Sequence, residues 1–170
     1  LLPTMVLGVL LGTLIGDQVP EEIFRKGMAT IILISVIMMI WWDKRKRKSV
    51  PDNLGFASVM GFTAGFTTMV GNLAGSFANL YFLAMQLPKN TFIGTTAWLF
   101  LIINLFKVPF HIWSWQTIDL ETATVSLAFI PAILLGLFTG IKLLKKINDQ
   151  FFRNFILIAT AIGAILIFVT

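Results

Sequence analysis

Long apolar runs constrain this chain more than any other feature of its sequence. Its 170 residues are 57% hydrophobic and only 12% charged, and the mean hydropathy is +0.89. An ordinary soluble domain carries about 25% charged residues, so this composition cannot cover a water-facing surface. The composition predicts an integral membrane protein, and the lengths of the runs predict an all-α polytopic fold.

The apolar runs have about the length of roughly 20 residues that a helix needs to cross a bilayer. The predicted spans are residues 1–16, 23–42, 90–112, 120–141 and 154–170. One further run, residues 53–88, holds 36 residues without a charge. This length is too great for one membrane span and too short for two complete spans. We therefore expect a hairpin of two shorter helices there, meeting at Gly71–Gly75 at mid-depth in the membrane.

Basic residues in the loops predict the orientation, because cytoplasmic loops carry an excess of Lys and Arg. Residues 43–53 hold five of them and are expected to be a cytoplasmic loop. With a hairpin at 53–88, ten of the 13 basic residues fall on the cytoplasmic side. A single span there would place the basic cluster that begins at Lys142 outside, so the hairpin is favoured.

Several function classes are excluded by composition. The chain has no cysteine and a single histidine, so we expect no metal site and no cofactor. No paired ionisable groups occur in the spans, which argues against an enzyme with catalytic residues. No phosphate-binding G-x-x-x-x-G-K-[ST] string is present. The expected partners are the lipid bilayer and a small solute, and not nucleic acid.

An internal repeat is visible when the sequence is shifted by 128 residues. The matched pairs are Pro3/Pro131, Leu7/Leu135, Gly8/Gly136, Gly12/Gly140, Phe24/Phe152 and Arg25/Arg153. Chance is the alternative, since apolar sequences match easily. The repeat predicts residues 1–42 as the end of a first repeat with two transmembrane helices and 54–170 as a second repeat. That second repeat holds a half-helix pair plus three transmembrane helices, inverted relative to the first. The counterpart of 53–130 is absent, so we expect a longer protein.

The string GFTTMVGNLAGSFAN, residues 65–79, is unusually polar for a membrane segment. Broken helices are tolerated in a membrane where their backbone lines a protein-enclosed cavity, and the N-terminus of a half-helix can receive an anion. We expect Ser76 to cap the second half-helix or to face the ligand. The predicted substrate-binding residues here are Gly71, Asn72, Gly75, Ser76 and Asn79, with Thr67 and Thr68 secondary. The alternative is close helix packing through glycines four residues apart.

The following span carries a polar stripe at helical spacing. Lys107 is predicted either to hold an anion together with the half-helix N-terminus, oriented by Asn104, or to snorkel to the outer interface. Thr96 and Trp98 are predicted to line the cavity, although a threonine more often bonds its own helix backbone. His111 is expected in an interfacial aromatic belt with Trp113 and Trp115, with a proton relay as the alternative.

Three strings carry a resemblance to a known family: GFTAGFTTMVGNLAG (61–75), LPKNTFIGTTAWLFLIINLFKVPF (87–110) and PAILLGLFTG (131–140). On these residues the chain resembles the sulfite exporter TauE/SafE family, as the C-terminal two-thirds of a member. Many members have a triple-glycine turn where this chain has Asn72-Leu73-Ala74-Gly75.

The resemblance implies a multi-pass permease of the bacterial inner membrane for small anions such as sulfite, sulfonates or other organosulfur anions. Coupling to an ion gradient, H⁺ or Na⁺, is implied instead of ATP, and a homo-oligomer is one expected arrangement. An anion channel and a non-transporting assembly subunit remain the alternatives.

Overall fold

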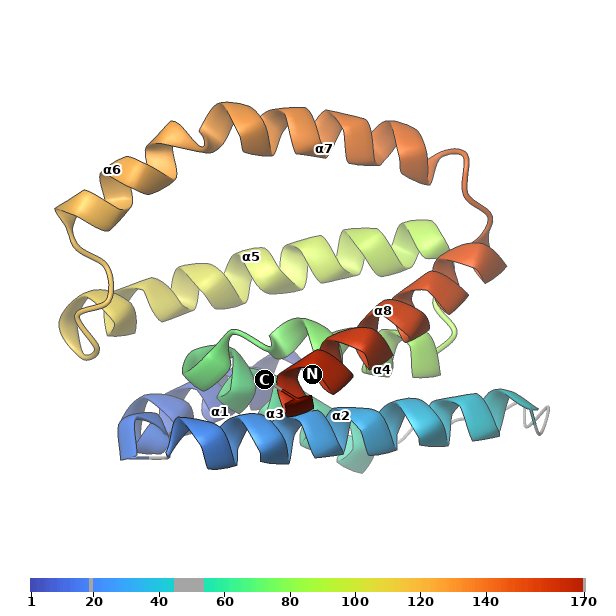
Figure 1. The fold of residues 1–170 in the computed structure, drawn as a ribbon, viewed down its shortest axis with the longest axis horizontal. Helices are drawn as coiled ribbons and strands as arrows, with labels where there is room; N and C mark the ends of the chain where they lie inside the picture. The colour runs from blue at the N-terminus through green and yellow to red at the C-terminus, as the bar shows by residue number, and fades with distance from the viewer. Residues whose placement is uncertain (19, 45–53, 170) are drawn as a thin grey trace.

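The computed structural model describes residues 1–18, 20–44 and 54–169, and its regular structure there is entirely helical. Most of the predicted cytoplasmic loop, residues 45–53, lies outside the described residues. The elements are α1 (Leu2–Ile15), a 3₁₀ turn (Gly16–Gln18), α2 (Glu21–Lys44), α3 (Leu54–Gly71), α4 (Ala74–Ala84), α5 (Lys89–Trp113), α6 (Leu120–Ala128), α7 (Ile130–Leu144) and α8 (Asp149–Val169). Figure 1 shows their arrangement.

Three described helices are long and apolar enough to cross a membrane, namely α3, α5 and α8. The pair α6 and α7 makes a fourth candidate if the two count as one broken span. These helices confirm the predicted all-α polytopic membrane fold.

The span predicted over 120–141 is not one straight helix, because α6 and α7 meet at an angle of 45°. The bend falls at Phe129, two residues before Pro131. Proline has no N–H to donate to the carbonyl four residues back, and its ring clashes with that carbonyl. The carbonyl of Leu127 instead accepts from the N–H of Phe129. The loop predicted over 142–153 is also shorter, since α7 continues to Leu144 and α8 begins at Asp149.

Glycines allow α1 and α3 to pack with their backbones nearly in contact. A Cβ added to Gly8 would lie 2.2 Å from the carbonyl oxygen of Phe62, and one added to Gly65 would lie 2.0 Å from that of Met5. A real Cβ atom at either distance would clash with the backbone of the neighbouring helix. The packing therefore requires glycine at both positions. Small residues are the usual means by which membrane helices approach closely.

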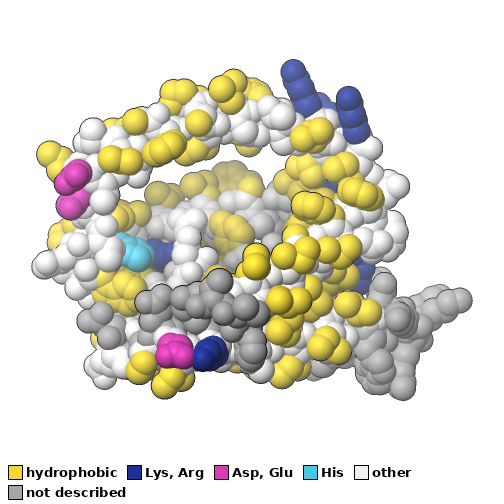
Figure 2. Space-filling model, in the orientation of Figure 1, with side chains coloured by type: hydrophobic (Ala, Val, Ile, Leu, Met, Phe, Trp, Pro, Cys, Tyr) yellow, Lys and Arg dark blue, Asp and Glu magenta, His cyan; other side chains and the backbone are white. Residues whose placement is uncertain are grey.

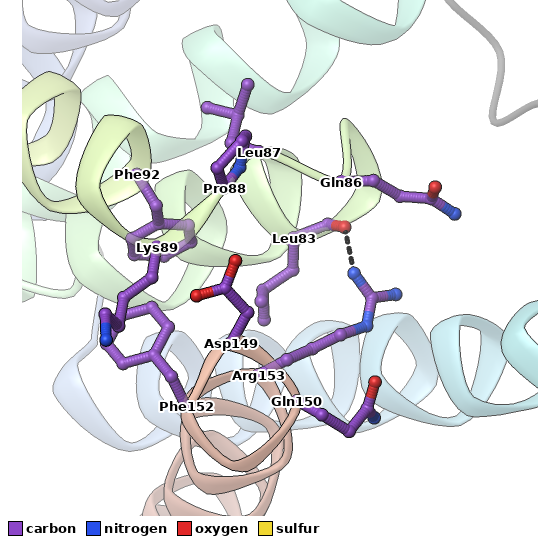
Figure 3. Close-up of a pocket in the computed structure, with 10 residues that line it drawn as sticks. All are labelled: Leu83, Gln86, Leu87, Pro88, Lys89, Phe92, Asp149, Gln150, Phe152 and Arg153. Atoms are coloured by element: carbon purple, nitrogen blue, oxygen red, sulfur yellow. Dashed lines mark hydrogen bonds between the residues drawn. The ribbon is translucent and has the colours of Figure 1, made fainter. Parts of the chain in front are cut away.

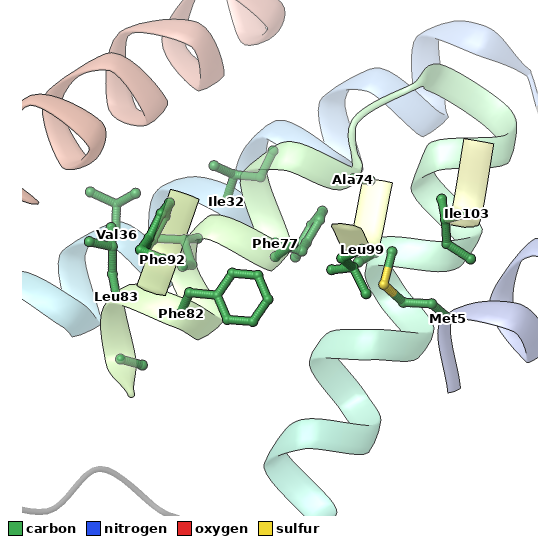
Figure 4. Close-up of a cluster of buried hydrophobic side chains, with 14 of the residues drawn as sticks. Met5, Ile32, Val36, Ala74, Phe77, Phe82, Leu83, Phe92, Leu99 and Ile103 are labelled. Atoms are coloured by element: carbon green, nitrogen blue, oxygen red, sulfur yellow. The ribbon is translucent and has the colours of Figure 1, made fainter. Parts of the chain in front are cut away.

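The short helix α4 is the centre of the molecule. Its buried residues surround the helix on nearly all sides and are Ala74, Phe77, Ala78, Leu80, Phe82, Leu83 and Ala84. It packs against α2, α3, α5 and α8, and Figure 4 shows its phenylalanines among side chains from α1, α2 and α5. With 11 residues it rises about 16 Å, roughly half the thickness of a bilayer core. It is therefore a re-entrant helix rather than a span.

The two copies of the predicted repeat form the same elements in the same register. Helices α1 and α2 begin at Leu2 and Glu21, and α7 and α8 begin at Ile130 and Asp149, each 128 residues later. Their surroundings differ, because α1 packs on α3 whereas α6 and α7 contain no buried residue. Figure 2 shows the hollow under the arch that α6 and α7 form. The division into two repeats stays a prediction, which this register supports.

Candidate functional site: the helix break and a buried lysine

The chain breaks its helix at Asn72, between α3 and α4. Asn72 has a φ of 54°, in the left-handed region, which asparagine visits more readily than most residues. The N–H of Leu73 then donates to the carbonyl of Thr67 at 3.1 Å and closes the end of α3. The predicted break is thus present, with α4 beginning at Ala74. Because α3 and α4 pack against each other, the chain turns back at this point.

The start of α4 has no side-chain cap. Its N-cap residue is Leu73, which offers no acceptor. The predicted capping role of Ser76 is wrong, since Ser76 lies inside the helix and its N–H donates to the carbonyl of Leu73 at 3.2 Å. The first N–H groups of a helix lack intrahelical partners. Because the Ser76 N–H is already used, the N–H groups of Ala74 and Gly75 are the candidates to receive a ligand, and the helix dipole favours an anion there.

Lys107 reaches from α5 to the other side of the same break. Its Nζ donates to the carbonyl oxygen of Thr68 at 2.8 Å, to Thr68 Oγ1 at 3.0 Å and to Asn72 Oδ1 at 3.2 Å. The residue is only 5% exposed, so the predicted snorkelling to the interface is wrong. The cation sits at the carbonyl end of α3, where the helix dipole is negative. No carboxylate pairs with Lys107 within the part of the chain that the structure describes.

The break lies close to the end of α5 that leads into the aromatic loop. Lys107 precedes the end of α5 at Trp113 by six residues, a rise of about 9 Å. The indole N–H of Trp115 donates to the carbonyl of Thr13 at 3.2 Å, near the end of α1. His111, in the last turn of α5, contacts this loop: its ring lies 5.7 Å from the Trp115 ring and its Nδ1 lies 2.7 Å from Thr117 Oγ1. The depth of the break in the membrane stays a prediction.

Two buried oxygens have no hydrogen-bond partner within the described chain, Asn79 Oδ1 and Thr96 Oγ1. The expectation that Thr96 bonds its own helix backbone is wrong, whereas Thr67 does so at 2.8 Å. Buried polar groups are rarely left unpaired, and such groups point to a ligand, water or ion. Asn79 lies one turn below Gly75, whose missing Cβ would sit 3.9 Å from its amide nitrogen. Thr96 is 11 residues from Lys107 along α5, about 16 Å away.

Two predicted site residues are not brought to the break. Asn104 is exposed and makes no hydrogen bond to Lys107, so its predicted orienting role is wrong. The oxygens of Thr68 and Asn72 orient the ammonium instead. Trp98 is 68% exposed and lies on the outward side of α5. Sequence reasoning gave Thr68 only a secondary place, and the one signal for it was its position one turn before Asn72.

The residues at the break offer binding and not metal chemistry. Among the described residues, no group of three or more His, Cys, Asp and Glu side chains could hold a metal ion. A cation, an asparagine amide and uncapped N–H groups converge where a membrane helix is interrupted. Such an arrangement, in an all-helical polytopic fold, is typical of membrane transport proteins.

The chain belongs to the sulfite exporter TauE/SafE family, whose family model matches residues 1–167. The match covers nearly the whole chain and confirms the resemblance carried by the glycine-rich string and the two strings after it. No curated protein and no solved structure matches the chain.

Proposed function

We propose that this protein is a secondary-active permease that moves small anions across a membrane by alternating access. Sulfite, sulfonates and other organosulfur anions are the expected substrates, because the family is that of sulfite exporters. The bacterial inner membrane is the proposed location, with residues 43–53 in the cytoplasm. A H⁺ or Na⁺ gradient is the proposed source of energy, and a homo-oligomer the proposed assembly.

One observation carries the proposal: Lys107 is a buried cation, and its hydrogen-bond partners among the described residues are neutral oxygens at the helix break. Of its three bonds, the one to Asn72 Oδ1 is the longest, at 3.2 Å. That bond joins the ammonium to a neutral amide, whereas an anion adds the attraction between opposite charges, which is strong where water is excluded. An arriving anion therefore displaces the Asn72 amide from Lys107 and is met by the uncapped N–H groups of α4.

The exchange of partners gives the break two states. Without substrate, the bond from Lys107 to Asn72 ties α5 to the turn between α3 and α4. With an anion on Lys107, that tie is released, so the turn is free to move relative to α5. A transporter needs such a bistable element, whose equilibrium the ligand shifts by binding one state more tightly.

Uptake into proteoliposomes tests the proposal, with sulfite, sulfate, thiosulfate and a sulfonate compared in turn. The decisive variant is Asn72→Asp, which supplies a permanent carboxylate to Lys107 and competes with the anion. We expect its KM for the transported anion to rise about tenfold, the size of one charge-assisted hydrogen bond. Lys107→Ala should abolish uptake, and Lys107→Arg should retain part of it.

The matched control is Lys142→Ala, which removes an exposed lysine of α7 that lies outside the break. Its uptake should equal that of the unaltered protein. Normal uptake by both Asn72→Asp and Lys107→Ala would remove the break from the transport path. Rates far above about a thousand ions per second, beyond ordinary turnover, would instead identify an anion channel.

A further inference from the structure

A second polar site lies at the opposite end of α4 from the break. Because α4 stops at Ala84 and α5 begins only at Lys89, the chain between them leaves a depression. This pocket encloses about 330 Å³, within the usual range for small-ligand sites. Its lining, drawn in Figure 3, consists of Leu83, Gln86, Leu87, Pro88, Lys89, Phe92, Asp149, Gln150, Phe152 and Arg153.

The two basic residues of the pocket are fixed by bonds to helix ends. The guanidinium of Arg153 donates to the carbonyl of Leu83 at 2.7 Å, in the last turn of α4. The ammonium of Lys89 donates to the carbonyl of Leu144 at 2.9 Å and also to that of Ile147, at the end of α7. Each cation is therefore held in place before any ligand arrives, which lowers the entropy cost of binding one.

The acidic residue of the pocket is placed differently. Asp149 opens α8, and the neighbouring Asn148 caps that helix by accepting from the N–H of Phe151 at 2.7 Å. The carboxylate of Asp149 is thus not needed as a cap. Figure 3 shows it pointing into the pocket, between the side of Lys89 and that of Arg153. It makes no ion pair or hydrogen bond with another described residue.

The pocket lies at the depth of lipid headgroups. Two candidate membrane spans begin at its lining residues, at Lys89 and at Asp149. Its apolar side is formed by the rings of Phe92 and Phe152, which meet edge to face at 5.3 Å. The loop charges predict that this is the cytoplasmic surface. Basic pockets between membrane helices on that surface are typical sites for lipid headgroups.

We propose that this pocket binds the headgroup of phosphatidylethanolamine from the surrounding bilayer. The ligand chemistry is a primary ammonium joined to a phosphate, and the pocket carries one carboxylate and two fixed cations to match. Asp149 accepts hydrogen bonds from the ammonium, while the phosphate lies toward Arg153. Phosphatidylglycerol lacks the ammonium, so it leaves Asp149 beside a phosphate. Phosphatidylcholine has a quaternary ammonium that cannot donate a hydrogen bond.

Native mass spectrometry of the purified protein, titrated with each of the three lipids, tests this assignment. We expect phosphatidylethanolamine to bind about tenfold more tightly than phosphatidylcholine, as one charge-assisted hydrogen bond allows. Asp149→Asn should remove that preference and leave the α8 cap on Asn148 intact. Equal binding of the two lipids to the unaltered protein would overturn the proposal, as would an undiminished preference in Asp149→Asn.

The matched control is Glu121→Gln, which removes a carboxylate from the first turn of α6, outside the pocket. It should keep the full preference for phosphatidylethanolamine, and a loss there would assign the effect to overall charge and overturn the site. A competition experiment with soluble phosphoethanolamine tests whether the ligand must be a lipid. If phosphoethanolamine displaces the lipid at equal concentration, the ligand is a free zwitterion and the lipid assignment is overturned. None of these measurements depends on transport at the helix break.

Discussion

The side-chain oxygen of Asn72 accepts a hydrogen bond at 3.2 Å from Nζ of Lys107, 35 residues further along the chain. Asn72 is also the residue at which the backbone turns into the left-handed region, with a φ of 54°. One residue thus supplies both the turn that ends α3 and an oxygen for the buried cation. The two contributions are separable, because one belongs to the backbone and the other to the side chain.

Replacing Asn72 by glycine and by alanine separates these contributions. Both variants lose the bond to Lys107, but only alanine is strained at a positive φ, by about 1 kcal/mol. Asn72→Ala should therefore unfold more easily than Asn72→Gly by about that amount. Reversible unfolding in mixed micelles measures the difference. Equal stabilities would mean that the left-handed turn relaxes when its side chain is lost.

Removing the Lys107 side chain should lower the free energy of unfolding, independently of any effect on transport. Lys107→Met keeps the apolar stem but leaves the oxygens of Thr68 and Asn72 without their donor. The oxygens of Thr68 are buried, and a buried acceptor that loses its partner costs about 1–3 kcal/mol, whereas Asn72 is exposed. Relief of the buried charge offsets part of that cost. We expect a net loss of about 2 kcal/mol in the same unfolding measurement.

The comparison for this variant is Lys26→Met, because Lys26 is exposed and its partner among the described side chains is Glu22, at 2.6 Å. Exposed pairs contribute roughly 0–1 kcal/mol, so Lys26→Met should change stability little. A loss at Lys107 no larger than that at Lys26 would show that the three hydrogen bonds contribute nothing to the fold.

The helix break could be predicted from sequence because its cause is local. Glycines and asparagines in an uncharged run of 36 residues leave few other solutions, and α3 and α4 meet within two residues of the predicted position. The start of α5 was equally readable, since its predicted first residue lies one position from the observed Lys89. In each case the signal was a change of composition within a few residues.

The partners of Lys107 could not be predicted in the same way. Spacing along α5 places Asn104 and Lys107 near one stripe, but it does not say which neighbouring helix faces that stripe. The structure brings the carbonyl end of α3 there, so Thr68 became a partner and Asn104 did not. The bend at Phe129 was missed for a different reason, since proline near a helix start is usually well tolerated.

The capping box of α6 should give that helix a defined dependence on pH. Asp119 accepts from the N–H of Thr122 at 2.8 Å, while its own N–H donates to Thr122 Oγ1. The N–H and also the hydroxyl of Thr122 donate to the Asp119 carboxylate and hold the pKa of that carboxyl below its usual range. A lowered pKa means that the cap stabilises α6 above the unfolded-state pKa of about 3.9. That contribution is lost as the pH falls through the lower pKa of the folded protein.

Hydrogen exchange of the α6 amides, compared at about pH 6 and below about pH 3 after correction for intrinsic rates, measures this loss. We expect protection to fall in acid in the unaltered protein. Asp119→Asn keeps a capping oxygen that does not titrate over this range, so its protection should be independent of pH. An equal fall in both proteins would place the titrating group elsewhere.

Gly8 and Gly136 are equivalent in the repeat but should respond in opposite ways to alanine. At Gly8 the new Cβ would lie 2.2 Å from the carbonyl oxygen of Phe62, so α1 and α3 must move apart. Overpacking of this kind costs about 1–3 kcal/mol, and backbone contact places Gly8→Ala at the upper end. At Gly136 no atom lies within 4 Å of the new Cβ, and alanine is the better helix former by about 1 kcal/mol. Gly136→Ala should therefore unfold no more easily than the unaltered protein. If Gly136→Ala were as damaging as Gly8→Ala in the same mixed-micelle assay, the face of α7 would be covered in the membrane by another helix.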